Sequence, residues 1–274
     1  MNPTPPEYLP WTASDFDFLA PHLPPPPPLS PSTTPTKPHL TLTYATSLDS
    51  MLAARPGVRT TLSGPATKTM THYLRSKHSA ILIGAGTALA DDPGLNCRLA
   101  GAADGDDPLR WQPRPVILDP RGRWDVEGSK VLQLAQEGRA RAPWVVTDLA
   151  FVDDAKAEAL EAVGGAVIAL ATEEEGGEGG GLRFGWGDLL GVLASRGVGS
   201  VMVEGGAGVI NGLLEERGEG WVDAVVVTVA PRWLGKGGVA VAPVKDGGEG
   251  AAAELRGAKW VQMGEDVVVC GTLA

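Results

Sequence analysis

The chain has 274 residues, a formal net charge of −10 and two cysteines, Cys97 and Cys270. The negative charge disfavours nonspecific binding to nucleic acid or to anionic membrane surfaces, because long-range steering toward either would be repulsive. No apolar run approaches the roughly 20 residues that a membrane span needs, and the N-terminus resembles neither a secretory signal nor a mitochondrial presequence. The cysteines form no disulfide framework and no metal motif, so we expect a cytosolic protein without a bound metal.

The N-terminal residues differ in composition from the rest of the chain. Residues 1–38 hold more than half of the 23 prolines, including the run Pro24–Pro28. This composition predicts an extended or disordered arm. Within it, residues 11–23 carry a capping pattern and apolar side chains, which predicts a short helix docked on the domain. We therefore expect an arm over residues 1–38 and a single domain over residues 39–274, and we expect deletion of residues 1–12 to leave turnover nearly intact.

From residue 39 onward, β-forming runs alternate with helical patterns until the last quarter, which is rich in β-formers. Strands are predicted at 39–46, 58–62, 80–83, 115–119, 144–147, 166–170 and 201–204, then at 222–230, 255–263 and 266–272. Helices are predicted at 65–77, 129–136, 153–163, 187–196 and 209–217. Gly-rich loops are predicted at 99–113, 173–181 and 245–251. This order predicts an α/β fold with a mainly parallel central sheet, flanked by helices and finished by antiparallel strands.

Two glycine-rich stretches follow predicted strands and indicate a ligand site. In the first, Gly84-Ala85-Gly86 is followed by Thr87 and Asp91, and in the second Glu204 precedes Gly205-Gly206-Ala207-Gly208. Glycines let the backbone approach a ligand closely, and the N–H groups of a helix start can bind an anionic group. The second stretch lacks the Gly-x-Gly-x-x-Gly fingerprint and comes late in the chain, so a Rossmann fold fits poorly. Each stretch alone could equally be a tight turn with a polar cap.

Together these motifs resemble the reductases of riboflavin biosynthesis. The resemblance rests on Leu42 to Asp49, Ser63-Gly64-Pro65, Thr71 to Arg75, Ala80 to Arg98 and Val203 to Gly206, which occur in the family's order. The chain is most similar to the single-domain fungal branch, whose substrate is 2,5-diamino-6-ribosylamino-4(3H)-pyrimidinone 5′-phosphate. The resemblance implies a dihydrofolate-reductase-like fold, NADPH as the cofactor, hydride transfer to C1′ of the ring-opened imine, and a homodimer.

The resemblance also assigns roles to individual residues. It implies cofactor contacts for Thr87, Asp91, Thr147, Gly205, Gly206, Ala207, Gly208, Val209 and Ile210. It implies substrate contacts for Arg75, Leu95, Arg98 and Glu204, with the two arginines on the phosphate. Glu204 and Asp49, or a water molecule, are the candidate proton donors, and the sequence does not choose among them.

One departure from the family and two alternatives remain open. Many relatives continue Ser-Leu-Asp with Gly-Lys, whereas Ser50-Met51 stand here, so either Arg55 or Arg59 replaces the lysine or this branch does without it. The alternatives are a related reductase of another pteridine or pyrimidine, and a non-catalytic module that keeps the fold. Paired phosphate-binding arginines argue against the first, and the intact glycines with Thr87 and Asp91 argue against the second.

Overall fold

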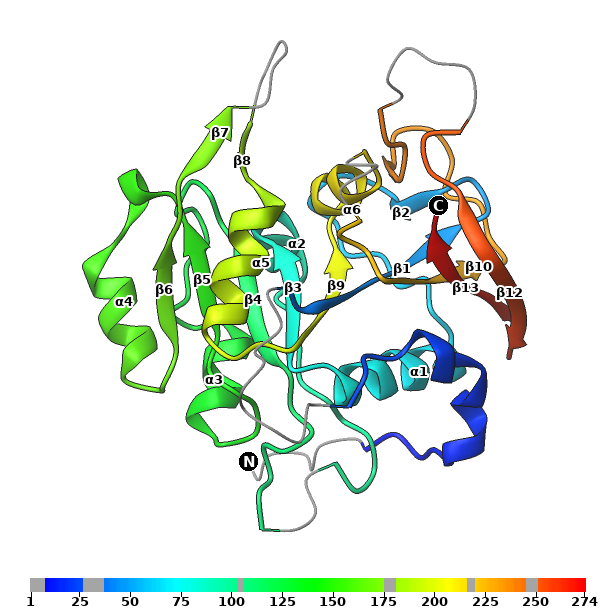
Figure 1. Cartoon of the computed structure of the whole chain (residues 1–274), viewed down its shortest axis with the longest axis horizontal. Helices are drawn as coiled ribbons and strands as arrows, with labels where there is room; N and C mark the ends of the chain where they lie inside the picture. Colours follow the sequence, from blue (N-terminus) through cyan, green and yellow to red (C-terminus); the bar gives the residue numbers. More distant parts are fainter. Residues whose placement is uncertain (1–7, 27–36, 103–105, 175–180, 216–219, 245–250) are drawn as a thin grey trace.

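The computed structural model describes residues 8–26, 37–102, 106–174, 181–215, 220–244 and 251–274. Its centre is a nine-stranded sheet in the order β12-β13-β10-β1-β9-β3-β4-β5-β6 (Figure 1). All pairs from β10 to β6 are parallel, and the pairs β10–β13 and β13–β12 are antiparallel. The predicted α/β fold with a mainly parallel central sheet and antiparallel C-terminal strands is therefore confirmed.

The strands of this sheet have the following bounds: β1 (His39–Ser47), β3 (Ala80–Gly84), β4 (Arg114–Leu118), β5 (Trp144–Thr147), β6 (Ala166–Ala169), β9 (Ser200–Gly205), β10 (Ala224–Ala230), β12 (Leu255–Met263) and β13 (Asp266–Leu273). Two small ribbons pair β2 (Met51–Ala53) with β11 (Val239–Ala240), and β7 (Thr172–Glu174) with β8 (Leu182–Phe184). The helices are η1 (Ala13–His22), α1 (Pro65–Lys77), α2 (Ala85–Asp91), α3 (Lys130–Gln136), η2 (Leu149–Phe151), α4 (Asp154–Glu161), α5 (Trp186–Ser195) and α6 (Ala207–Glu215).

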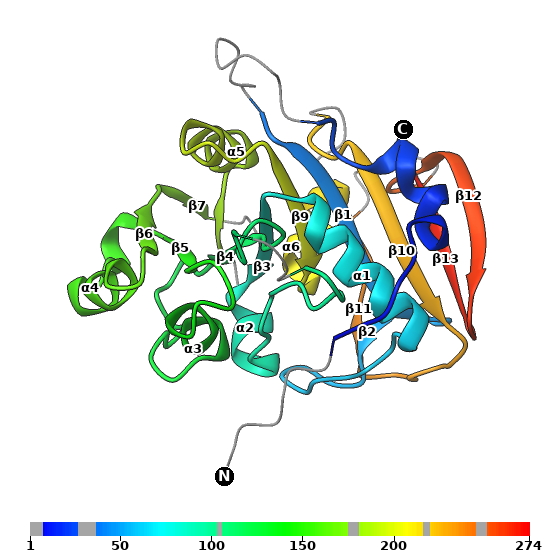
Figure 2. The same cartoon turned by 90° about the horizontal axis from the view of Figure 1, so that it is seen from below.

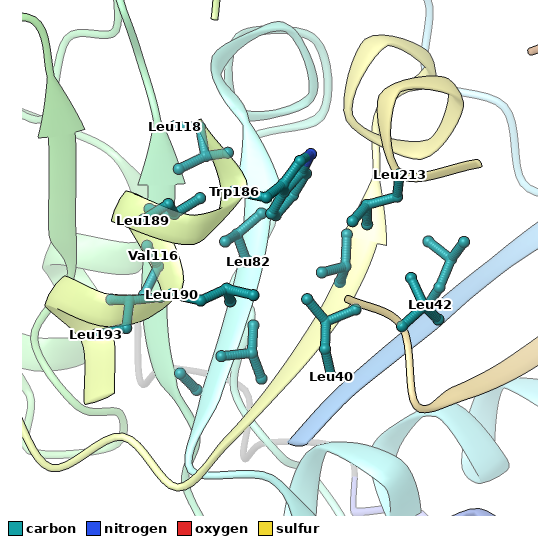
Figure 3. Packing of buried hydrophobic residues seen from close by; sticks show 14 of the residues in the cluster. Leu40, Leu42, Leu82, Val116, Leu118, Trp186, Leu189, Leu190, Leu193 and Leu213 are labelled. Carbon is teal, nitrogen blue, oxygen red and sulfur yellow. The ribbon is translucent and has the colours of Figure 1, made fainter. Parts of the chain in front are cut away.

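Helices cover both faces of the sheet, because successive side chains of a strand point to opposite faces. In β3, Leu82 joins the cluster under α5 and α6, while Ile81 and Ile83 join the cluster under α2, α3 and α4. Figure 3 shows the first cluster, with Trp186 and Leu190 of α5 packed over the strands. A third cluster lies between α1, η1 and the strands β10 and β13 (Figure 2).

Two local predictions were wrong. Residues 58–62 form no strand; instead the segment folds back, and Ala54 N donates to Thr60 Oγ1 at 3.0 Å. The strand of this region is β2, which pairs with a partner far along the chain that local periodicity does not reveal. The glycine turn expected after β3 is instead the start of α2, because the alanine-rich residues 85–90 favour helix.

The N-terminal segment contacts the domain at two places. Phe16 and Leu19 of η1 are buried against α1 and the C-terminal strands. Further upstream, Leu9 forms a β-bridge with Leu99, through Leu9 N to Arg98 O at 2.8 Å and Ala100 N to Leu9 O at 3.0 Å. The segment therefore supports the backbone beside Arg98, and deletion of residues 1–12 would remove these two hydrogen bonds. Three parts of the predicted loops and arm lie outside the described residues: 245–250, 175–180, and Pro27 and Pro28 at the end of the polyproline run.

The last strand of the chain fixes the start of α1. Pro65 occupies the first helical turn, where a missing N–H group costs nothing. The buried carboxylate of Asp266 in β13 accepts hydrogen bonds from Gly64 N at 2.7 Å and from the Thr67 hydroxyl. A carboxylate at this end is also favoured by the helix dipole. The direction of α1 is thus set by a residue about 200 positions away.

Buried His78 makes the fold sensitive to acid. Its Nδ1–H donates to Leu74 O at 2.7 Å, so its Nε2 accepts from Thr41 Oγ1 at 2.8 Å, and burial lowers its pKa from 6.5 to about 4. The unfolded chain therefore binds a proton at a higher pH than the folded chain. The stabilisation is complete above pH 6.5 and is lost as the pH falls toward 4.

We expect this one residue to reduce the free energy of unfolding by about 2 kcal/mol between pH 7 and pH 5. Urea unfolding at both pH values, compared between wild type and His78→Asn, isolates the effect, because among the causes of the His78 shift only the smallest, the charge of nearby His39, comes from another titrating group. The variant should lose about 2 kcal/mol less than wild type over this range. Equal losses in the two proteins would contradict the assignment.

Candidate active site

A cavity of about 430 Å³ opens at the carboxyl ends of β1, β9 and β3. This is the edge of a parallel sheet at which ligands usually bind, and the volume lies in the range of small-molecule sites. The glycine-rich stretches form one side of it, and the segment after β1 together with β11 forms the other. It is lined by Tyr44, Ala45, Leu52, Ala53, Arg55, Pro56, Gly57, Val58, Thr60, Gly84, Gly86, Thr87, Ala90, Asp91, Glu204, Gly205, Gly206, Ala207, Gly208, Val209, Ile210 and Val239.

The start of α6 is suited to an anionic group. Ile210 N donates to Gly206 O at 3.0 Å, so the N–H groups of residues 207–209 come before the first intrahelical bond. All three of these residues line the cavity. Gly205 has a φ of +122°, which side chains rarely tolerate, and a Cβ on Gly206 would lie 2.8 Å from Thr87 Oγ1. The two glycines therefore bring the backbone close to α2 and leave the helix start open to a ligand.

Thr87 and Asp91 lie one turn apart on α2 and both face this cavity. Burial raises the pKa of Asp91, and the charge of Arg59 partly opposes that change. The two stretches predicted from the sequence thus meet at one cavity. Eight of the nine residues predicted to contact a cofactor line it.

Glu204 is held by a bidentate ion pair with Arg75. Arg75 Nε donates to Glu204 Oε1 at 2.7 Å, and Nη2 donates to Oε2 at 2.6 Å. The side chains are only 12% and 16% exposed. Burial alone would lower the pKa of Arg75, but the Glu204 carboxylate raises it overall. The remaining Nη1 donates to Asn96 O at 3.0 Å, so Arg75 joins α1, β9 and the loop after α2.

Arg98 lies beside a second, smaller cavity of about 90 Å³, which Asn96 also lines. Arg98 N donates to His72 Nδ1 at 3.1 Å, and its Nη2 lies 3.2 Å from His72 Nε2. Burial and the charges of Arg75 and Arg98 lower the pKa of His72 to about 2. A neutral imidazole has a single acceptor nitrogen. His72 therefore accepts a hydrogen bond either from Arg98 N or from Arg98 Nη2, but not from both. The Leu95 side chain is buried, so only its backbone can reach a ligand.

Like Arg75, Leu95 and Arg98, the predicted site residues Asp49 and Thr147 do not line the main cavity. The carboxylate of Asp49 accepts from Leu234 N at 3.0 Å, from Gly235 N at 2.7 Å and from the Ser47 hydroxyl. The Ser47 hydroxyl and these backbone N–H groups lower the pKa of Asp49 to about 2. Asp49 is therefore ionised at neutral pH and holds a turn, which does not suit a proton donor.

Thr147 ends β5, two strands away from Gly84 in the sheet. Its buried hydroxyl has no hydrogen-bond partner among the described residues, and it does not line the cavity.

The cavity also contains residues to which the sequence assigned no role or only an alternative one. Tyr44 of β1 lines it, and burial raises the pKa of its phenol. Its position in an alternating strand predicts burial but does not reveal the cavity. Arg55 lines it as well and is the better placed of the two arginines that could replace the missing lysine. Val239 belongs to β11, which the sequence did not predict.

Within the described ranges, no group of three or more His, Cys, Asp or Glu side chains is placed to hold a metal ion. Among the same residues, no helix is long and apolar enough to cross a membrane.

Comparison with known proteins identifies a family. Residues 38–269 match the family model described as the RibD C-terminal domain. The 2,5-diamino-6-ribosylamino-4(3H)-pyrimidinone 5′-phosphate reductase of Eremothecium gossypii is 45% identical over 268 residues, which cover 97% of this chain and 99% of that protein. The solved structure of the Saccharomyces riboflavin biosynthesis reductase is 32% identical, with a TM-score of 0.72, covering 94% and 99% of the two chains. Acinetobacter baumannii RibD shares the fold at 23% identity and a TM-score of 0.65, covering 87% and 59%.

The buried ion pair gives a testable prediction about stability. Glu204→Gln leaves the Arg75 charge without its partner in a largely buried place, so we expect the free energy of unfolding to fall by about 3 kcal/mol. The same substitution in the exposed pair of Glu137 with Arg139 should cost less than about 0.5 kcal/mol. Urea unfolding of Glu204→Gln, Arg75→Gln and the double variant should show coupling of at least about 1.5 kcal/mol. Additive losses would mean that the two side chains do not act as a pair.

Proposed function

Because this chain belongs to the RibD C-terminal domain family, we propose that it reduces 2,5-diamino-6-ribosylamino-4(3H)-pyrimidinone 5′-phosphate with NADPH in riboflavin biosynthesis. That the chain is an oxidoreductase follows from its named relatives. The observation that supports the proposal most is the single cavity at which the start of α6, the α2 residues Thr87 and Asp91, and the anchored Glu204 meet. The relatives give no support to another pteridine reductase or to a non-catalytic module.

The α6 side of the cavity fits a dinucleotide cofactor. The N–H groups of residues 207–209 can bind a pyrophosphate, and the absence of side chains at Gly205 and Gly206 leaves room for it. Thr87 and Asp91 offer a hydroxyl and a carboxylate to the same ligand. NADPH, when bound, supplies the hydride. Thr147, at the same edge of the sheet but two strands away, would belong only to the far end of an extended cofactor.

The substrate lies, in this proposal, between Glu204 and Arg98. Glu204 presents a fixed carboxylate to the cavity, where it can accept hydrogen bonds from N–H or O–H groups of the substrate. A guanidinium can donate two parallel hydrogen bonds to a phosphate, and we assign this role to Arg98. Arg75 acts through Glu204 and Asn96 rather than on the phosphate directly.

Catalysis then depends mainly on placement. The ribosylamino ring opens to an imine, and hydride transfer to C1′ requires the donor and acceptor to be held in line with water excluded. Glu204 orients the substrate, while Tyr44 and the glycines form the walls of the cavity. Since Asp49 is ionised and holds a turn, water is the proton source that we favour.

We also propose a cytosolic homodimer. The two cysteines are free and buried, in keeping with a reducing compartment. The edge strand β12 carries Trp260 with 66% of its surface exposed, and an apolar side chain of this size on a sheet edge favours pairing with a second copy.

The proposed reaction is tested by titrating NADPH fluorescence and then adding the ribosylamino-pyrimidine phosphate while following NADPH absorbance. Binding followed by substrate-dependent oxidation supports the proposal. Binding without oxidation would require another substrate, and absence of binding would contradict the cofactor assignment.

Substitution of Gly206 tests the cofactor side of the cavity. The new Cβ of Gly206→Ala would lie 2.8 Å from Thr87 Oγ1, so either the Thr87 side chain or the helix start must shift, and both face the proposed cofactor. We expect the dissociation constant for NADPH to rise at least about tenfold, which corresponds to about 1.4 kcal/mol. Gly212→Ala is the matched control, because it lies on α6 outside the cavity and its Cβ would meet nothing within 4 Å. Equal affinities in both variants would rule out a tight approach at Gly206.

Substitution of Arg98 tests the substrate side. Arg98→Ala removes charge-assisted hydrogen bonds to the phosphate, and we expect KM for the substrate to rise about 10- to 100-fold with little change in KM for NADPH. Arg139→Ala is the control, because Arg139 lines the same small cavity but is 44% exposed and paired with Glu137. Steady-state kinetics with each ligand varied gives both constants. A parallel rise in the two would place Arg98 outside the phosphate site.

A further inference from the structure

A third hollow, of about 330 Å³, lies at the opposite edge of the sheet from the active site. His78 and Ser79 precede β3, Arg114 begins β4, Trp144 begins β5, and Arg196 follows α5. These are the amino ends of the parallel strands, toward the bottom of the sheet in Figure 1. The hollow is therefore separated from the cofactor cavity by the length of the strands.

Four arginines line this space: Arg110, Arg114, Arg141 and Arg196. We call it the arginine hollow. None of the other lining residues is charged at neutral pH. His78 could in principle carry a charge, but burial lowers its pKa to about 4, so it is neutral as well. None of the four arginines forms an ion pair with a described carboxylate. A local excess of positive charge thus persists in a chain whose net charge is −10.

Backbone and ring contacts hold the two less exposed arginines in place. Arg114 Nη1 donates to Ala142 O at 2.7 Å and to Gly164 O at 3.2 Å, and its Cζ lies 4.6 Å from the Trp144 ring centroid. Arg141 Nε donates to Gln112 O at 2.9 Å. These bonds use only some of the five N–H groups of each guanidinium.

Placing these cations together is unfavourable without an anion. Burial, and then the charge of Arg141, lower the pKa of Arg114. Arg196 adds a further charge above the same Trp144 ring, with its Cζ 5.6 Å from the centroid. An arginine cluster of this kind becomes favourable when a ligand with several anionic oxygens accepts the remaining N–H groups.

We propose that the arginine hollow binds a small anion that carries two or more linked phosphate groups. The planar forks of four guanidinium groups can each take a pair of phosphate oxygens, which one isolated phosphate could not satisfy. The shared chemistry is therefore a polyphosphate chain, either free or as part of a nucleotide.

The test compares binding of tripolyphosphate and of ATP, without magnesium, by isothermal titration calorimetry. Arg110→Gln with Arg196→Gln removes the two exposed charges, which have the fewest structural contacts. The control is Arg183→Gln with Arg256→Gln, an equal change of charge on exposed arginines outside the hollow. Thermal unfolding without ligand shows whether each variant is folded. If the double variant is not folded, Arg110→Gln alone replaces it.

We expect tripolyphosphate affinity to fall at least about tenfold in the hollow variant and less than about twofold in the control. Tighter binding of ATP than of tripolyphosphate would show that the nucleoside contributes contacts, and equal binding would assign the site to phosphates alone. Absence of binding to wild type, or equal weakening in both variants, would overturn the proposal. Unchanged affinity in the hollow variant would place the anion at the start of α6 or at Arg98, and would overturn it too.

Discussion

The arrangement of the active site depends on the ion pair between Arg75 and Glu204. Glu204, the penultimate residue of β9, lines the main cavity, and Arg75 reaches it from α1 with two short hydrogen bonds. A pair of this kind adds little net stability, since both charges lose their water, but it fixes the position of each partner. The third hydrogen bond of Arg75, to Asn96 O, also fixes the position of the loop that precedes Arg98. One guanidinium thus sets both the Glu204 carboxylate and the loop that leads to Arg98, the two groups to which we assign the substrate.

That constraint works only because of the order of the strands. In the sheet, β9 lies between β1 and β3, although it follows both of them by more than 100 residues in the sequence. Val203 of β9 therefore pairs with Leu42 of β1 on one side and with Leu82 of β3 on the other. The insertion brings the glycines after β9 beside Gly84, where a Cβ would lie 3.2 Å from Val209 Cγ2. The antiparallel end of the sheet contributes at a distance, because Asp266 of β13 fixes the start of the helix that carries Arg75.

The helices and strands that could be predicted from the sequence are those that depend on a local pattern of residues. Apolar runs followed by glycines showed the strands β3 and β9 and the ligand-binding edge, and Pro65 marked the start of α1. The parts that could not be predicted depend on partners far along the chain. Asp49 resembles a catalytic carboxylate until its donors, Leu234 N and Gly235 N, are known. Arg75 likewise resembles a phosphate ligand in the sequence, but its guanidinium is hydrogen-bonded to the Glu204 carboxylate. The strand β2 is defined only by its pairing with β11, which lies far along the chain.

The segment after β1 shows how the site accommodates a changed sequence. Ser50 has a φ of +60°, a conformation that favours glycine, so the glycine expected here from the family's pattern matches the backbone. The next residue, Met51, belongs to the ribbon with β11, where a Cβ on Gly238 would lie 3.0 Å from Met51 Sδ and 2.7 Å from Ala53 O. An apolar side chain at position 51 therefore packs within the ribbon. Arg55 lies at the end of the same short segment and lines the cavity, so it brings a positive charge to the space that the expected lysine would have served.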